Sequence, residues 1–276
     1  MDVAGSTVMI TGAGGGLGEV IARDLASRGA RLVLTGRRAE QVDDLAAELG
    51  GTAVAADLNR RDDVAVLAEW MTDVDCLVAN AAVGRGPALV ELDEPTINES
   101  FEVNLRAPVV LATRLIRDHL ASGRPGSVVM IGALAGRAPT PQSHVYCAGK
   151  AGLRGFVLST AQDLRDTNVG ISIVEPATVR DRGMFHRGGS VLPPGTRTAS
   201  PAQVAAGVRT AMRTGRPEIV VAPVEQRVLA TFGAAAPSLL ARLFGLVGGI
   251  GPTADSASGN DGTPATDRRS TDTSGG

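Results

Sequence analysis

The chain has 276 residues, a net charge of −2 at pH 7 and a hydrophobic fraction of 43%, which is enough to bury a sizeable core. Chains of this length often form one large α/β domain. The sequence has no basic run of the kind that binds nucleic acid. It also has no early apolar segment followed by a cleavage site, so we do not expect export.

The cysteine and histidine content is low. Two cysteines, Cys76 and Cys147, fit a reducing compartment. With only three scattered histidines beside them, they supply too few ligands for a metal site. We therefore expect a cytoplasmic protein that acts on a small molecule, with no bound metal, no nucleic-acid partner and no firm membrane association.

In chain order, short apolar runs alternate with amphipathic stretches, which is the pattern of βαβ units in a parallel sheet. The predicted strands cover residues 7–10, 31–35, 52–56, 75–79, 127–131, 171–175 and 218–221. The predicted helices cover residues 19–27, 39–49, 62–71, 96–119, 144–166 and 201–213. Pro108 is a candidate kink in the fourth helix. The pattern predicts a Rossmann-type doubly wound parallel sheet in a single domain.

Three segments fall outside this alternation. Residues 182–198 contain Gly and Pro pairs and are interpreted as a mobile loop that could close over substrate. Residues 225–247 are apolar and could cover the substrate pocket, join a subunit interface or touch a membrane surface. We place the folded domain at residues 1–250 and a disordered polar tail at residues 251–276, because the tail has almost no large apolar residue.

A glycine-rich turn separates the first predicted strand from the first predicted helix. Glycines let the backbone turn sharply and let a pyrophosphate approach closely, while the helix N-terminus offers unpaired N–H groups. Such turns are common, but this position at the start of a βαβ unit predicts dinucleotide binding. The candidate contacts are Thr11, Gly12, Gly16, Leu17 and Gly18.

The only tyrosine and the only lysine of the chain lie four residues apart, as Tyr146 and Lys150. All the other basic residues among the 27 Lys and Arg are arginine, which does not easily replace a compact ammonium. Positions four apart share one face of a helix. Because a nearby ammonium lowers the pKa of a phenol, the pair is a candidate proton donor and acceptor near neutral pH.

The ordered set of motifs resembles the short-chain dehydrogenase/reductase family over about residues 5–222. The glycine turn is similar to the cofactor motif of that family, and Tyr146-x-x-x-Lys150 is similar to its catalytic pair. The resemblance implies that Tyr146 moves a proton at a carbonyl or carbinol while hydride moves at the nicotinamide, and that Lys150 also bonds the nicotinamide ribose.

The resemblance implies further site residues. Asp57 and Leu58 follow the third strand and match the adenine contact, and Asn80 matches the motif after the fourth strand. Asn104 matches the residue that holds a water of the proton relay. From its residue type alone, Asn104 is equally well read as an interior asparagine at a helix distortion. The resemblance also implies that the helices near residues 96–120 and 144–166 pack against partners in a homodimer or homotetramer.

The end of the second predicted strand bears on the choice of dinucleotide. Many NAD sites place an acidic residue there to bond the ribose 2′-hydroxyl. Here the residue is Gly36, followed by Arg37 and Arg38, so no carboxylate repels a 2′-phosphate and a guanidinium is available to grip it. We therefore expect NADP rather than NAD, with Arg37 as the main contact. The alternative is that both arginines are a solvated start of the next helix.

Several positions depart from the family pattern. Ala133 stands where the family has a serine that bonds the substrate oxygen, and Ala82 stands where glycine is usual. After Pro176 the family has glycine and then a threonine for the carboxamide, and here Ala177 follows, with Asp181 near the threonine position. Thr178 is a candidate shifted donor.

Ser143 and His144 lie just before Tyr146 and could replace the missing serine, although a solvated loop is the simpler reading. Three functions follow. The first is an NADP-dependent oxidoreductase that interconverts a carbonyl and an alcohol on a small molecule. The second is a catalytically weak nucleotide-binding regulatory or partner subunit. The third is an enzyme of the same fold that performs an epimerisation or a dehydration.

Overall fold

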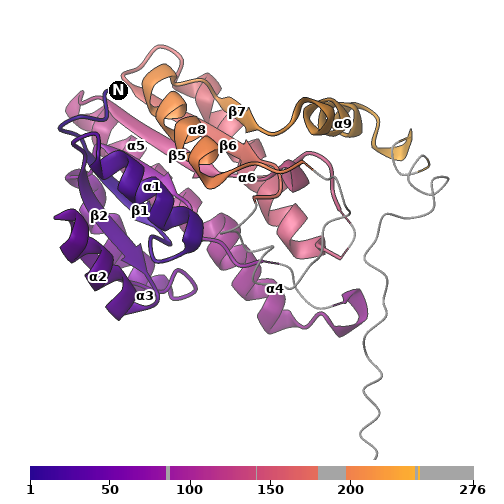
Figure 1. The fold of residues 1–276 in the computed structure, drawn as a ribbon, viewed down its shortest axis with the longest axis horizontal. Coiled ribbons are helices and arrows are strands. Elements are labelled where there is room, and N and C mark those ends of the chain that lie inside the picture. The colour runs from indigo at the N-terminus through magenta and orange to yellow at the C-terminus, as the bar shows by residue number, and fades with distance from the viewer. Residues whose placement is uncertain (85–87, 141, 180–196, 240–241, 243–276) are drawn as a thin grey trace, which may run out of the picture.

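The computed structural model describes residues 1–84, 88–140, 142–179, 197–239 and 242, and it confirms the predicted fold class. One parallel sheet has the strand order β3-β2-β1-β4-β5-β6-β7 (Figure 1). Its strands are β1 (Thr7–Thr11), β2 (Arg31–Gly36), β3 (Thr52–Ala55), β4 (Cys76–Ala79), β5 (Gly126–Ile131), β6 (Val169–Pro176) and β7 (Glu218–Val221). The strand order reverses between β1 and β4, and open α/β sheets bind ligands at the carboxyl ends of strands at such a point.

Helices cover both faces of the sheet (Figure 1). They are α1 (Gly16–Ala26), α2 (Ala39–Leu49), α3 (Arg61–Glu69), α4 (Glu94–Phe101), α5 (Ala107–Ser122), α6 (His144–Asp163), α8 (Pro201–Thr214) and α9 (Val224–Ala235). Short 3-10 turns lie at Trp70–Thr72, Leu89–Glu91 and Leu134–Gly136. The apolar sides of α3, α5 and α6 bury one face, and those of α1, α2 and α8 bury the other.

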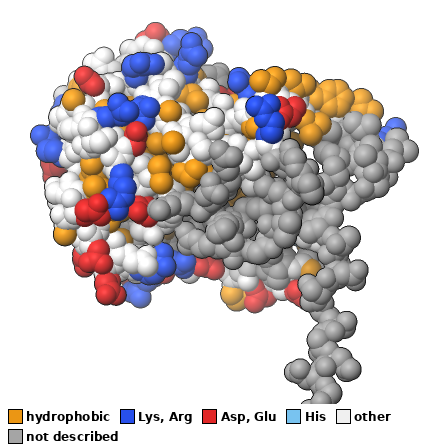
Figure 2. Space-filling model, viewed as in Figure 1, with side chains coloured by type: hydrophobic (Ala, Val, Ile, Leu, Met, Phe, Trp, Pro, Cys, Tyr) orange, Lys and Arg blue, Asp and Glu red, His pale blue; other side chains and the backbone are white. Residues whose placement is uncertain are grey.

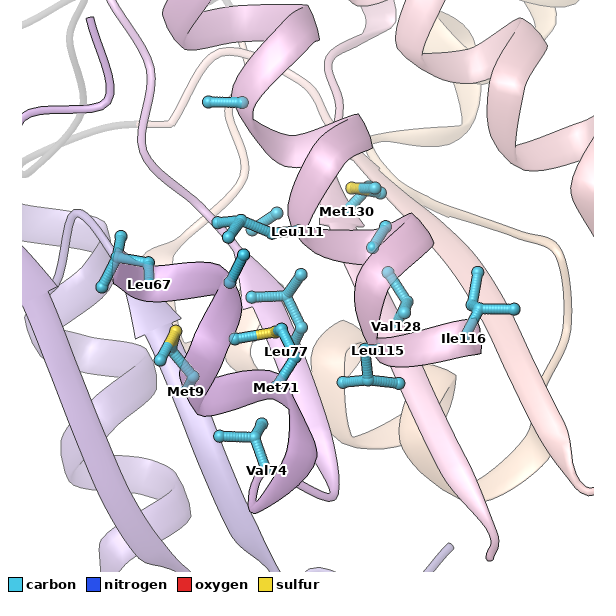
Figure 3. Packing of buried hydrophobic residues seen from close by; sticks show 14 of the residues in the cluster. Met9, Leu67, Met71, Val74, Leu77, Leu111, Leu115, Ile116, Val128 and Met130 are labelled. Carbon is cyan, nitrogen blue, oxygen red and sulfur yellow. The ribbon is translucent and has the colours of Figure 1, made fainter. Parts of the chain in front are cut away.

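The core on the α5 side illustrates why the strands are so apolar. Met9, Leu77 and Met130 come from three neighbouring strands and meet Leu111 and Leu115 of α5 (Figure 3). All five side chains are fully buried. A parallel sheet with both faces covered needs such continuous apolar runs, and this explains why the strand predictions agree with the structure to within two residues at either end.

Several predicted helix boundaries differ from the structure by one to three residues. α1 begins at Gly16 rather than Glu19, because the last glycines of the turn already adopt helical backbone angles. α6 ends at Asp163 rather than Asp166. α2 has the predicted bounds, and Gly50 closes it with a positive φ of 65°.

The prediction of one long helix over residues 96–119 is confirmed in its extent, but the helix is not regular. The structure has α4, then a π-helical turn from Glu102 to Arg106, then α5. Pro108 has no N–H to offer the carbonyl four residues earlier, which belongs to Asn104, so the ordinary hydrogen-bond ladder is interrupted there. The π-helical turn therefore ends two residues before Pro108, and turns of this kind are frequent at functional sites.

Candidate active site

The glycine turn between β1 and α1 is tightly packed. Gly12 has a φ of 67°, and a Cβ on it would lie 2.8 Å from the Cα of Ala81. A Cβ on Gly18 would lie 2.2 Å from the carbonyl oxygen of Gly12. No side chain fits at either position. α1 starts directly after this turn, at Gly16, so its first N–H groups point out of the turn without partners inside the helix.

Thr11 and Asn80 hold the turn in place. The buried Thr11 hydroxyl accepts hydrogen bonds from the backbone N–H groups of Asn80 and Ala81, each at 3.1 Å. The Asn80 amide donates to the carbonyl oxygens of Thr11 at 3.0 Å and Gly12 at 3.2 Å. Thr11 at the end of β1 and Asn80 just after β4 thus fix the shape of the turn together. Leu17 is half-buried on the first turn of α1.

The residues after β2 lie beside the turn. The Arg38 guanidinium donates to the carbonyl oxygen of Gly14 at 3.3 Å. Arg37 is 60% exposed and reaches the other way, to Glu99 of α4, with its Nη1 3.4 Å from Oε1. Arg38, which the sequence interpretation ranked second, is therefore the arginine that contacts the turn.

Asp57 and Leu58 follow β3 and adjoin the same region. The N–H of Ala56 donates to the carbonyl of Gly36, so the ends of β2 and β3 stay together. The Asp57 carboxylate accepts the N–H of Asn59 at 3.0 Å, and Leu58 is 6% exposed. One oxygen of Asp57 thus closes a local turn, while Leu58 belongs to the core.

Tyr146 and Lys150 lie on one face of α6. The ammonium of Lys150 is 5.8 Å from the centroid of the Tyr146 ring and donates to the carbonyl oxygen of Ile131 at 2.8 Å. Burial lowers the pKa of Lys150 to about 8 and raises the pKa of the Tyr146 phenol. The expected lowering of the phenol pKa by the ammonium is absent, because burial dominates and the ammonium binds the end of β5.

Asn104 sits in the π-helical turn and is fully buried. Its amide donates to the carbonyl of Val83 at 3.1 Å and to the hydroxyl of Ser100 at 3.2 Å, and its oxygen accepts the N–H of Val83 at 3.1 Å. Its Cβ is 3.3 Å from where a Cβ on Gly149 would stand, so it packs next to Lys150. Asn104 therefore links the segment after β4 to the helix of the Tyr/Lys pair.

The predicted substrate-side residues come from three separate segments of the chain. Ala133 is half-buried and directly follows the end of β5. Ser143 is 3% exposed at the N-terminus of α6, whereas His144 beside it is exposed. Thr178 is half-buried after β6, and its carbonyl accepts the N–H of Ala199 at 3.0 Å. Asp181 and most of the predicted loop 182–198 lie outside the described residues.

A charge network of Arg137, Arg154, Glu175 and Glu218 lies beside these residues. Glu175, at the end of β6, is fully buried, and its Oε2 is 2.5 Å from Arg137 Nε. Arg137 also contacts Glu218 at 2.5 Å, and Arg154 contacts the same carboxylate at 2.7 Å. Burial raises the pKa of Glu175, and Arg137 opposes that shift. The sequence interpretation missed this network; an acid within the apolar strand 171–175 was the available signal.

The charge network fixes the loop that carries Ala133. Arg137 follows Ala133 by four residues and ties the loop to β6 and β7. A Cβ on Gly136 would lie 2.9 Å from the carbonyl oxygen of Lys150, and one on Gly132 would lie 2.7 Å from Ile173. The loop is thus clamped between α6 and β6 next to the Tyr/Lys pair. A surface hollow of about 630 Å³ beside Met1 and α8 contains none of the candidate residues.

Comparison of the sequence with known protein families gives a match that covers most of the chain. The family described as short chain dehydrogenase matches residues 6–187. The chain belongs to the short-chain dehydrogenase/reductase family. The match spans the glycine turn, the π-helical turn and the Tyr/Lys pair, so membership in this family of oxidoreductases agrees with the resemblance drawn from the motifs.

Individual relatives are moderately similar. Nodulation protein G of a Rhizobium species is 35% identical over 184 residues, which cover 64% of this chain and 75% of that protein. Among solved structures, a metagenomic short-chain oxidoreductase in complex with NADP has a TM-score of 0.65 at 32% identity, covering 80% of this chain and 98% of that chain. A short-chain dehydrogenase from Sphingobium yanoikuyae in complex with NADPH has a TM-score of 0.71 at 26% identity, covering 92% and 99%.

Proposed function

We propose that this short-chain dehydrogenase/reductase is an NADP-dependent enzyme that interconverts a carbonyl and an alcohol on a small molecule. The observation that carries the proposal is the position of Lys150 Nζ, 5.8 Å from the Tyr146 ring, in a chain with no other lysine or tyrosine. Two structural relatives were solved with NADP or NADPH, which supports the choice of dinucleotide.

The packing of the glycine turn fits a dinucleotide. Its backbone leaves no room for a Cβ at Gly12 or Gly18, and α1 directs unpaired N–H groups from Gly16 onwards. Charges of a pyrophosphate are stabilised at such a helix N-terminus. In this proposal Thr11, Gly12, Gly16, Leu17 and Gly18 form the phosphate cradle.

Other residues would bind the remaining parts of the dinucleotide. Arg38 and Arg37 bind the 2′-phosphate, with Arg38 favoured by its contact with Gly14. Asp57 and Leu58 would contact the adenine and Thr178 would bind the carboxamide, while Asn80 supports the turn. When bound, the dinucleotide gives or takes the hydride.

The chain itself moves the proton. Tyr146 transfers it to or from the substrate oxygen, and the Lys150 ammonium lies 5.8 Å from the centroid of its ring. Lys150 is buried and Tyr146 is half-buried, so little bulk water screens the charge of the ammonium at this site. Asn104 orders the neighbouring backbone and positions a water for the relay.

Titration with NADPH and NADH, followed by a panel of ketones and aldehydes read at the nicotinamide absorbance, tests the proposal. We expect tighter binding of NADPH and turnover of at least one carbonyl. Binding of neither dinucleotide would overturn the proposal.

One observation favours a second candidate, a nucleotide-binding subunit with little catalysis. Ala133 offers a methyl group where the resemblance implies a serine hydroxyl, and His144 is exposed. A protein that binds NADPH tightly but turns over no carbonyl in the panel would support this second function.

We also propose that α5 and α6 form the contacts of a homodimer or homotetramer. On the outer side of α6, Ala151, Gly152, Gly155 and Ser159 are exposed, and a Cβ on Gly155 would meet nothing within 4 Å. Such a flat surface allows close approach of a second helix. Light scattering of the purified chain measures the oligomeric state.

A further inference from the structure

The helix α9 exposes its large apolar side chains. It follows β7 and stands off the sheet (Figure 1). The exposed fractions are 69% for Val224, 64% for Val228 and 40% for Phe232. These residues recur every fourth position, so they form one stripe along the helix. Figure 2 shows the stripe as a run of orange side chains on the protruding part of the molecule.

The opposite side of α9 is built from small residues. Ala230 is 4% exposed, and Gly233 is also buried. This arrangement reverses that of an ordinary surface helix, whose large apolar residues face the core. The exposed stripe is therefore not explained by packing within the described part of the chain.

We propose that the stripe of Val224, Val228 and Phe232 binds the surface of an anionic lipid membrane. A helix with an apolar face can lie in the interface plane with that face among the headgroups, without spanning the bilayer. In the described part of the chain, no helix has the length and apolar character needed to cross a membrane. The proposed contact is one with the membrane surface and is independent of the proposed catalytic function.

The charge of this region complements an anionic surface. α9 carries one acidic residue, the exposed Glu225, whose charge is paired with Arg197 at 3.7 Å. From Gln226 to Ala254 the sequence has two arginines, Arg227 and Arg242, and no further acidic residue. Both arginines are exposed. Anionic headgroups attract basic residues placed next to an apolar face, and each contributes measurably to binding.

The size of the stripe argues against a second protein copy as its partner. A helix of 12 residues is about 18 Å long, and a strip about 10 Å wide along it offers about 180 Å². A stable interface buries about 800 Å² on each partner. The stripe is also convex, since it lies on a single protruding helix (Figure 1).

Sedimentation of the full chain with lipid vesicles tests the proposal. Vesicles of phosphatidylcholine alone are compared with vesicles that contain about one third phosphatidylserine. We expect the native chain to sediment with the anionic vesicles. The double variant Val228→Glu/Phe232→Glu should lose at least tenfold of this binding. The double variant Arg227→Gln/Arg242→Gln should lose about fivefold per arginine, on anionic vesicles only.

A matched control separates the stripe from apolar exposure in general. Val66 on α3 is 52% exposed, and Val66→Glu should bind vesicles like the native chain. All variants should keep the native melting temperature and NADPH affinity. Absence of native binding to both vesicle types, or native-like binding by Val228→Glu/Phe232→Glu, overturns the proposal. If that variant instead changes the molecular mass by light scattering while no chain binds vesicles, the stripe is an interface between copies and the membrane proposal is wrong.

Discussion

The two sides of the carboxyl edge of the sheet are held together by different means. At β1 and β4, neutral hydrogen bonds between Thr11 and Asn80 fix the glycine turn. At β5 and β6, buried charges fix the loop after Ala133, with Glu175 fully buried against Arg137. In the proposed function the first side binds the nucleotide and the second side binds the substrate, so neutral hydrogen bonds fix one half of the site and buried charges fix the other.

The largest expected effect is the loss of turnover when Tyr146 can no longer transfer a proton. Tyr146→Phe removes only a hydroxyl, so turnover should fall by about a hundred- to ten-thousandfold while NADPH affinity stays within twofold. Stopped-flow rates and fluorescence titration measure the two quantities. Unchanged turnover would assign the proton transfer to another group.

Ala133→Ser tests whether the substrate side lacks a donor. A hydroxyl aimed at developing oxyanion charge is worth about a hundred- to a thousandfold in rate, so kcat should rise toward that extent with little change in NADPH affinity. If Ser143 already fills the role, Ala133→Ser should have little effect and Ser143→Ala should be the damaging change. Steady-state rates on one shared ketone distinguish the two outcomes.

Burial of Lys150 predicts a pH-dependent stability. Its pKa is lowered to about 8, so between about pH 8 and pH 10 the folded state binds fewer protons than the unfolded state. The free energy of unfolding of the native protein should therefore rise relative to Lys150→Met over this window, and the gain is lost as the pH falls through 8. The full shift corresponds to about 3 kcal/mol. Urea unfolding at several pH values measures it, and a constant difference would contradict it.

The smallest expected effect is on NADPH affinity and distinguishes the roles of Arg37 and Arg38. Arg38→Ala should weaken NADPH binding by about tenfold and leave NADH binding nearly unchanged, since only the 2′-phosphate loses a charged partner. Arg37→Ala should have a smaller effect, because Arg37 pairs with Glu99. Equal losses for both dinucleotides in both variants would show that neither arginine reads the 2′-phosphate.

Sequence patterns predicted the sheet well because buried parallel strands are continuous apolar runs, as in β4 and β5. They failed at residues 102–106, where one proline and a buried asparagine replace regular helix with a π-helical turn. Contacts between residues far apart in the sequence could not be predicted from its patterns either. The choice between Arg37 and Arg38 depends on Glu99, which lies far along the chain. The two partners of Glu175 come from the loop after β5 and from α6.

The charge network also constrains how this chain can change over time. Replacing Arg137 or Glu175 alone leaves a buried charge without its nearest partner, which typically costs several kcal/mol. Replacing both with apolar residues of similar volume is often nearly neutral. Substitutions at these positions should thus survive in pairs. We therefore expect Arg137 in this loop to change in evolution only together with its ion-pair partners. These partners are Glu175 on β6 and Glu218 on β7, and Glu218 also pairs with Arg154 on α6.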